Sequence, residues 1–432
     1  MRHFNASINS ERKLFLFVFI FLYPIVPLNY YIIGSVNVLN SISLILFIWF
    51  LFKDKITLFR IRKANAFFWL YMMVFAMQTF ISAGVLKGMG YVLSYLFVCI
   101  VIITHVQTKA EFTKIIDYFI YGSCILSFLG IIETITDNHI FQSRLLMNSD
   151  IIRYGFTRSS VTFGHPINFG MYQSIMAALA FYRITNTDIT RKKRNFFFIM
   201  YAIISVRVVV SVSRLAICLL LFSQFLALRK LELGKKKNLF ISAIIAIVLS
   251  VFLTDILGFE FLNELISDFW KMICEVLGIN LNSKAEISYG NRFDLYNWVI
   301  DDVKGHEWFG LGVGAKFSYK MHEWFTKTSI EVHYLYVYYQ QGLFGLFALI
   351  LSYVGSLYFI QNKKEKKLGF EGILNFNTIC FFLLIGYFVC LFGVQETDLK
   401  RIYNVLLTLN ICYNRICHQS LASAEYLGNN SS

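Results

Sequence analysis

The chain has 432 residues, of which 57% are hydrophobic and only 15% are charged. A soluble domain is usually about 45–50% apolar and about 25% charged, so this chain has too few polar residues to cover a soluble surface. The composition excludes an ordinary soluble enzyme and a disordered chain, and it predicts an all-α polytopic membrane protein. About twelve transmembrane helices of about 20 residues would account for the apolar content.

The apolar segments divide residues 1–432 into about twelve transmembrane spans, which we take as a single integral membrane domain. Two long connectors interrupt them, a first outer loop over 133–165 and a large extracytoplasmic loop with short helices over 258–342. Residues 414–432 are predicted to be a cytoplasmic tail. The spans are 14–30, 36–52, 64–82, 90–104, 114–132, 166–182, 195–210, 213–228, 239–257, 343–360, 373–392 and 402–413.

The net charge of +14 sets the predicted orientation. Lys and Arg cluster in alternate connectors, which places those connectors and both termini in the cytoplasm. This explanation needs no nucleic-acid partner. Segment 195–228 has strongly basic flanks on both sides, so it must cross the membrane twice. This predicts a turn near 208–213, which places Arg207 and Arg214 at the outer face.

The first outer loop carries Arg153 and Arg158 and ends in His165-Pro166. Proline is tolerated in the first turn of a helix, so His165 is expected at a helix entrance on the outer boundary. Two interpretations of His165 stay open and weigh equally: a residue that binds substrate, and a capping or interfacial histidine.

The large outer loop contains an amphipathic segment at 291–304. Asn291 and Asp294 resemble a capping pair, and Gly305 ends the predicted helix. Arg292 falls in its first turn, where the helix dipole disfavours a cation. This suggests an anionic partner, although a solvated surface arginine is the more common explanation. The apolar positions that share one face are 295, 296, 299, 300 and 303.

A glycine-rich run, Gly310-Leu311-Gly312-Val313-Gly314, follows this helix. A nucleotide-binding loop would follow a strand in a βαβ unit, and none is predicted, so that reading is rejected. The run is better explained by a tight backbone path.

An aromatic helix is then predicted from His333 to Gly342, and it includes Tyr336. It could be an interfacial belt, yet His333 is one of few outer groups that could move a proton near neutral pH. The outer face therefore offers several arginines and two histidines. It has no acidic cluster of the kind that holds Mg²⁺, so we expect no metal and no other cofactor. Arginines suit direct binding of a diphosphate.

These elements, in this order, resemble the O-antigen polymerase and O-antigen ligase superfamily of bacterial membrane glycosyltransferases. The resemblance covers most of the chain in topology. It departs from the family pattern at Leu215, Tyr334 and Trp308-Phe309. The segments that carry it are Ser213-Arg214, Arg292 within 290–298, the run 310–314, His333 with Tyr336, Gln341-Gly342-Leu343-x-Gly345-Leu346, and Arg158 with 163–168.

The resemblance implies a GT-C-like fold in the bacterial cytoplasmic membrane, with its active site on the extracytoplasmic face. It implies inverting, metal-independent transfer of a glycan from undecaprenyl diphosphate. Arg214 and Arg292 would contact the diphosphate, and His333 would assist the acceptor hydroxyl. The expected substrate-binding residues are Arg153, Arg158, His165, Arg207 and Tyr336.

The polymerase of O-antigen, capsule or exopolysaccharide repeat units is the favoured activity. Its expected partners are the undecaprenyl-diphosphate-linked glycan as donor and acceptor, the lipid bilayer and, as a candidate, a chain-length regulator. The nearest alternative is an O-antigen ligase, which passes the glycan to lipid A-core. A polysaccharide flippase or other transporter is a second alternative, but coupled carriers usually keep acidic groups near the membrane midplane, and here they are nearly absent from it.

Overall fold

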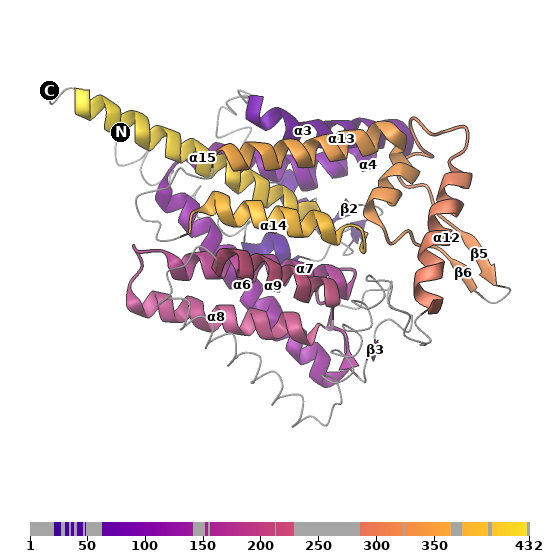
Figure 1. Ribbon diagram of the computed structural model, residues 1–432, viewed down its shortest axis with the longest axis horizontal. Helices are drawn as coiled ribbons and strands as arrows, with labels where there is room; N and C mark the ends of the chain where they lie inside the picture. Colours follow the sequence, from indigo (N-terminus) through magenta and orange to yellow (C-terminus); the bar gives the residue numbers. More distant parts are fainter. Residues whose placement is uncertain are drawn as a thin grey trace.

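The structure is a computed structural model in which most helices lie side by side in one bundle, with the helix that begins at Glu286 beyond one end of it (Figure 1). The predicted span 239–257 lies outside the residues that it describes, as do most of 14–30 and about half of 36–52. The described residues are 21–26, 31–33, 36–38, 41–45, 48, 63–140, 152–153, 156–211, 213–228, 286–322, 325–363, 374–395 and 400–429.

Most of the described chain is helical. The helices are α3 (Lys63–Ala83), α4 (Val85–Tyr91), the π-helix η1 (Val92–Phe97), α5 (Val98–His105), α6 (Lys109–Thr136), α7 (Pro166–Thr185), α8 (Arg191–Val210), α9 (Arg214–Leu228), α12 (Glu286–Asp302), α13 (His333–Lys363), α14 (Phe376–Cys390) and α15 (Lys400–Asn429).

Three short antiparallel hairpins, which the sequence reading did not predict, accompany the helices. They pair β1 (Tyr31–Ile33) with β2 (Val36–Asn37), β3 (Ile152–Arg153) with β4 (Phe156–Thr157), and β5 (Tyr319–His322) with β6 (Phe325–Lys327). Each strand is at most four residues long, too short to give a clear alternating pattern.

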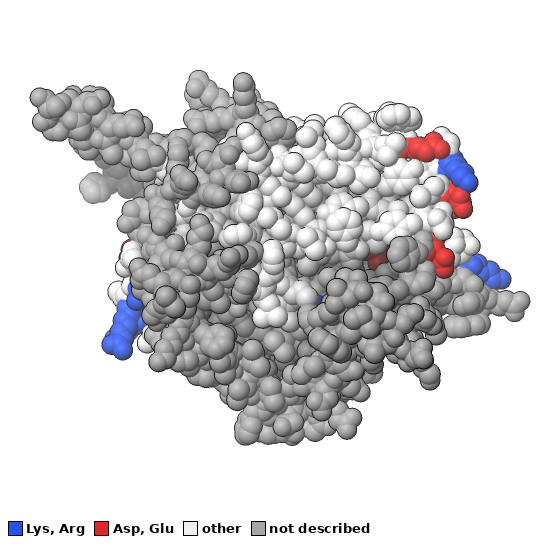
Figure 2. Space-filling view, in the orientation of Figure 1, with Lys and Arg blue, Asp and Glu red and all other residues white. Residues whose placement is uncertain are grey.

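Within the described residues, three helical segments are long and apolar enough to cross a membrane: Val85–Ile103, Lys109–Thr136 and His333–Ile360. Shorter apolar helices cover Trp69–Ala83, Arg214–Gln224 and Phe376–Cys390. In Figure 2 the described charged side chains gather at the two ends of the bundle, and the described residues between them on this face are almost all uncharged. This distribution is typical of a membrane protein.

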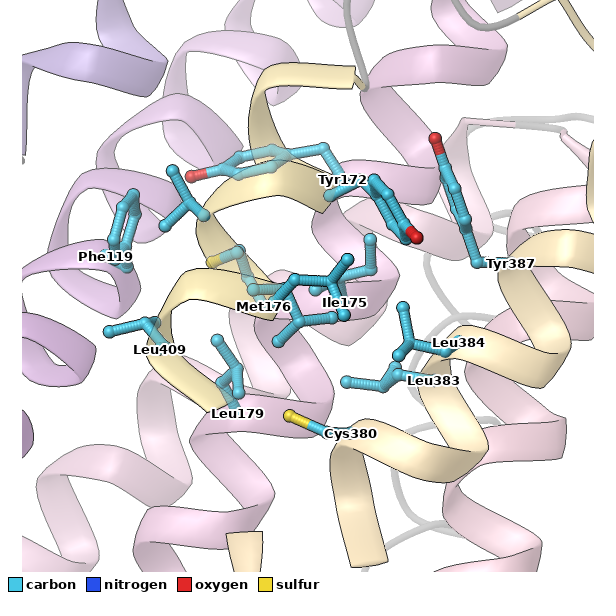
Figure 3. Close-up of a cluster of buried hydrophobic side chains, with 14 of the residues drawn as sticks. Phe119, Tyr172, Ile175, Met176, Leu179, Cys380, Leu383, Leu384, Tyr387 and Leu409 are labelled. Carbon is cyan, nitrogen blue, oxygen red and sulfur yellow. The ribbon is translucent and has the colours of Figure 1, made fainter. Parts of the chain in front are cut away.

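Helix α7 forms the centre of the bundle, and 17 of its 20 residues are buried. Its predicted start at Pro166 is confirmed. Because all sides of the helix are covered, its apolar residues pack against several neighbours at once (Figure 3). The cluster drawn there joins Tyr172, Ile175, Met176 and Leu179 of α7 to Cys380, Leu383, Leu384 and Tyr387 of α14, with Phe119 of α6 and Leu409 of α15.

An ion cluster closes the C-terminal end of α7. Arg183 Nε lies 2.6 Å from Asp117 Oδ1, and Lys193 Nζ lies 2.8 Å from Asp117 Oδ2. Asp117 and Arg183 are buried, so each compensates the other's loss of water. The three residues come from α6, α7 and α8, and they fix these helices together at the end opposite to His165.

The predicted break inside 195–228 is confirmed, since α8 ends at Val210 and α9 begins at Arg214. The amphipathic helix, by contrast, begins earlier than predicted. Because α12 begins at Glu286, Asn291 lies inside the helix and does not cap it. Arg292 lies beyond the first turn, so the helix dipole does not disfavour its charge and gives no reason to expect an anionic partner there.

The buried face of α12 is also narrower than predicted. Leu295, Val299 and Val303 are fully buried, whereas Tyr296 and Ile300 are exposed. The buried positions follow a spacing of four and pack in a second, smaller core. Its other members are Phe317, Ile330, Val332, Leu335 and Tyr339. Helix α15 continues to Asn429, through most of the segment 414–432, and the cytoplasmic location of that segment stays a prediction.

A sharp bend at Gly342 divides α13 into two parts. Gly342 has φ 64° and ψ −164°, a conformation that is essentially restricted to glycine. The predicted aromatic helix His333–Gly342 and the predicted span 343–360 are therefore one element, α13, with a break at Gly342.

The backbone groups freed by the bend are satisfied by the loop that carries the glycine-rich run. Leu311 N–H donates to Tyr339 O at 2.9 Å, and Gly312 N–H donates to Gln340 O at 3.0 Å. In the other direction, Leu343 N–H donates to the carbonyl oxygen of Glu307 at 2.8 Å. We call residues 305–314 the bracing loop. Gly310, Gly312 and Gly314 all have positive φ, which confirms the predicted tight path.

Gly342→Ala should lower the free energy of unfolding by roughly 2 kcal/mol or more. An added Cβ would lie 2.4 Å from the carbonyl carbon of Trp308, in a backbone conformation that alanine rarely adopts. Thermal unfolding of the detergent-purified protein measures the loss. Gly314→Ala is the matched control, since it has φ 95° but no atom within 4 Å of the added Cβ. Equal losses in the two variants would contradict the role of the close contact.

Candidate functional site

The break between α8 and α9 is organised by two buried serines. Ser213 caps α9, since its Oγ accepts the N–H of Ala216 at 3.4 Å. Ser211 Oγ in turn donates to Val208 O at 2.6 Å, at the last turn of α8. Arg214 is the first residue of α9 and is half-buried. The predicted Ser213-Arg214 pair therefore stands at a helix N-terminus, which favours anions.

Two buried arginines surround this break. Arg158 donates from Nε to Ser211 O at 3.3 Å. Arg207 donates from Nη2 to Ser159 O at 3.0 Å and also to Ser159 Oγ, and its guanidinium lies over the Phe169 ring at 4.9 Å. Its Nε and Nη1 have no hydrogen-bond partner among the described residues. The sequence-predicted residues Arg158, Arg207 and Arg214 thus come together at one end of the bundle.

Glu133, near the end of α6, is a component of this region that was not among the predicted site residues. It is fully buried, and its carboxylate accepts the N–H of Val161 at 3.0 Å and the N–H of Ile140 at 2.9 Å. It also interacts electrostatically with Arg207. The sequence signal was present, since a carboxylate beside an apolar span is costly unless it has a partner.

Val161, whose N–H donates to Glu133, has a strained backbone conformation. Its φ of 48° is unusual for a β-branched residue, and its side chain is buried. Such strain persists only where the surroundings enforce it, and it is common at functional sites. The turn that contains Val161 also contains Ser159, which accepts a hydrogen bond from Arg207. Glu133 and Arg207 therefore both bond to this turn.

His165 takes the capping role that the sequence left as one of two interpretations. Its Nδ1 accepts the N–H of Ile167 at 3.1 Å, and it stands at the N-cap of α7. The ring is half-buried. A substrate-binding role for His165 stays a prediction.

His333 begins α13 and is fully buried. Its backbone N–H donates to Leu391 O at 3.0 Å, just beyond the end of α14. Tyr334 Oη donates to Phe388 O of the same helix at 2.8 Å. The ring of Tyr336 lies 6.3 Å from the His333 ring, centroid to centroid. The first part of α13 is therefore attached to the C-terminal end of α14.

The end of α14 also contacts the start of α9. Cys390 Sγ lies 3.7 Å from Leu215 O, in the residue that follows Arg214. Since His333 bonds to Leu391 and Cys390 contacts Leu215, one turn of chain at the end of α14 separates the His333 segment from the Arg214 segment. The bend at Gly342 allows the His333 segment to reach the end of α14. At the bend itself the chain lies beside α3, since Gln78 Nε2 donates to Gln341 O at 3.2 Å.

Two further predicted residues are placed by their backbones alone. Arg292 lies within α12, three residues before the buried Leu295. The small core of α12 includes Val332, which precedes His333, so α12 packs close to the start of α13. Arg153 lies in β3, whose partner strand leads directly into Arg158. The positions of the Arg153 and Arg292 side chains stay predictions.

A comparison of the sequence with protein-family models finds no match, and a comparison with curated proteins finds none either. Within the described part of the chain, no three His, Cys, Asp or Glu side chains come close enough together to hold a metal ion.

Glu133→Gln should destabilise the protein by roughly 1.5–3 kcal/mol, because it removes the charge that accepts two backbone N–H groups and faces Arg207. The measurement is thermal unfolding of the purified protein. Glu307→Gln is the control, because Glu307 is fully exposed and its carboxylate accepts the N–H of Gly305 in its own loop. Unfolding temperatures that match for both variants would show that Glu133 does not hold the Val161 turn.

Proposed function

We propose that this chain is a polymerase of undecaprenyl-diphosphate-linked oligosaccharide repeat units, as for O-antigen, capsule or exopolysaccharide. In this proposal it has about twelve spans, cytoplasmic termini and a GT-C-like fold in the bacterial cytoplasmic membrane. The reaction is an inverting, metal-independent glycosyl transfer on the outer face.

The observation that carries the proposal is the convergence of cationic and proton-accepting groups at one end of the bundle. Arg158 bonds to the break before Arg214, and His333 attaches to the end of α14, whose Cys390 contacts the residue after Arg214. Arginine pairs well with phosphate oxygens, and a helix N-terminus adds favourable N–H groups. These are the groups that a lipid-linked diphosphate needs.

The proposed step transfers a glycan between two oxygens. The acceptor hydroxyl oxygen forms a bond to the anomeric carbon of the donor sugar, and the bond from that carbon to the diphosphate oxygen breaks. The diphosphate leaves with the bonding electrons, stabilised by Arg214 and Arg292. His333 takes the hydroxyl proton. Because His333 is fully buried, the scheme requires the first turn of α13 to move when the acceptor binds.

The remaining predicted residues have supporting roles in this scheme. Arg153, Arg158, Arg207, His165 and Tyr336 would shape the donor site around the reacting groups. A chain-length regulator is a candidate partner.

Two alternatives differ from this proposal in acceptor or in chemistry. An O-antigen ligase would use the same donor and the same arginines, but it would pass the glycan to lipid A-core. A flippase or other transporter needs no set of arginines and histidine at one outer end. The arrangement around Arg214 and His333 therefore favours a transferase over a transporter.

Arg214→Ala and Arg292→Ala should each abolish long glycan chains while single repeat units stay attached to their acceptor. The reason is that the leaving diphosphate loses its stabilising charge. The measurement is the glycan ladder on a gel, from cells that lack the natural gene and carry each variant. Membrane abundance of each variant is checked by immunoblot.

Arg191→Ala provides the matched control, since Arg191 is exposed at the opposite end of α8. It should give a normal ladder. Normal ladders from both site variants would refute the diphosphate-binding role. Loss of all attached glycan, with glycan left on the lipid carrier, would identify a ligase instead.

A further inference from the structure

The bracing loop exposes two large aromatic side chains at its centre. Trp308 is 69% exposed and Phe309 is 68% exposed. Large apolar side chains that are adjacent and exposed mark a surface for a partner. The residues just before them are polar, and Glu307 keeps its charge because hydrogen bonds from backbone N–H groups, first that of Gly305, lower the pKa of its carboxyl. The bracing loop therefore changes from polar to aromatic between Glu307 and Trp308.

The backbone of this loop holds the two aromatics at a defined depth. Phe344 N–H donates to Trp308 O at 3.1 Å, and Leu343 N–H donates to Glu307 O at 2.8 Å. Trp308 and Phe309 are thus fixed level with the first residues after the bend in α13. The rings of Phe309 and Phe344 lie 6.0 Å apart, centroid to centroid.

The exposed aromatics continue an apolar stripe along the membrane-spanning part of α13. Its members recur every three or four residues, so they share one face of the helix. The stripe consists of Phe344, Phe347, Ile350, Val354 and Tyr358. From Leu343 to Lys363, where a basic cluster begins, the helix rises about 30 Å, which equals the thickness of a bilayer's hydrocarbon core.

The turn between α3 and α4 also exposes large apolar side chains. Ile81 and Val85, on either side of the turn between α3 and α4, are 78% and 71% exposed. Ser82 of this turn accepts the N–H of Val313 from the bracing loop at 2.8 Å. The two exposed apolar regions are therefore joined at one level of the bundle.

We propose that Trp308 and Phe309 insert into the interfacial layer of the outer leaflet of a phospholipid bilayer. Tryptophan prefers the boundary between headgroups and hydrocarbon, and the stripe of α13 below it faces the acyl chains. The loop then fixes the depth of the bend at Gly342, and with it the segment His333–Gln341, at the membrane surface. The inference requires that α13 crosses a bilayer, and it does not depend on glycosyl transfer.

The experiment uses the full chain in phosphatidylcholine vesicles and compares the wild type with Trp308→Phe. The difference in tryptophan emission reports on Trp308 alone. This component should be quenched about twofold more by lipids brominated near the headgroup than by lipids brominated deep in the chain, and little by iodide in the water. Trp298→Phe is the control, since Trp298 stacks on Tyr319 at 3.8 Å and its emission should be unaffected by either lipid.

Two results would overturn the inference. Quenching of the Trp308 component by iodide, without quenching by brominated lipid, would place the loop in water. Quenching by neither would mean that protein covers it, either a partner or a second copy of the chain.

Discussion

The bend at Gly342 is the constraint on which the rest of the structure depends. A broken helix leaves backbone carbonyl and N–H groups without partners, and each costs several kcal/mol in an apolar surrounding. Leu311 and Gly312 supply the missing donors, and Glu307 supplies an acceptor. Gly310 allows this close approach, because an added Cβ there would lie 2.5 Å from the backbone of Gln340 and Gln341. Bend and bracing loop therefore form only together.

The bend determines where His333 lies. The first part of α13 contacts the end of α14 through His333 and Leu391, and it contacts α3 through Gln341 and Gln78. At that end of the bundle Arg158 and Arg207 are already held around the start of α9, with Glu133 as the buried counter-charge. The opposite end of α7 is closed by the Asp117 ion cluster, so the two charged regions of the bundle are separated by an apolar interior. In the proposed function, this division keeps the polar chemistry at one membrane face.

Local chemistry made part of this structure predictable. Proline after His165 marked the start of α7, and the basic flanks of 195–228 required the break near Ser211. The glycines at 310, 312 and 314 correctly indicated a tight path. The partners of those glycines could not be predicted, because they lie about 30 residues away in α13. The same holds for Glu133, whose role depends on the fold of the Val161 turn. The start of α12 at Glu286 was missed, because the predicted start rested on Asn291 and Asp294, which lie inside the helix.

The most direct test of the bend is a disulfide between Tyr334→Cys and Phe392→Cys, in a Cys390→Ser background. The two native rings lie 4.5 Å apart, centroid to centroid. A protease site engineered between residues 363 and 374 lets a gel detect the link between fragments. We predict that the fragments stay joined until reduction, whereas Phe347→Cys with Phe392→Cys does not link them. If α13 ran straight, residue 334 would stand about 13 Å beyond the membrane span. Fragments that separate without reduction in the folded protein would contradict the account.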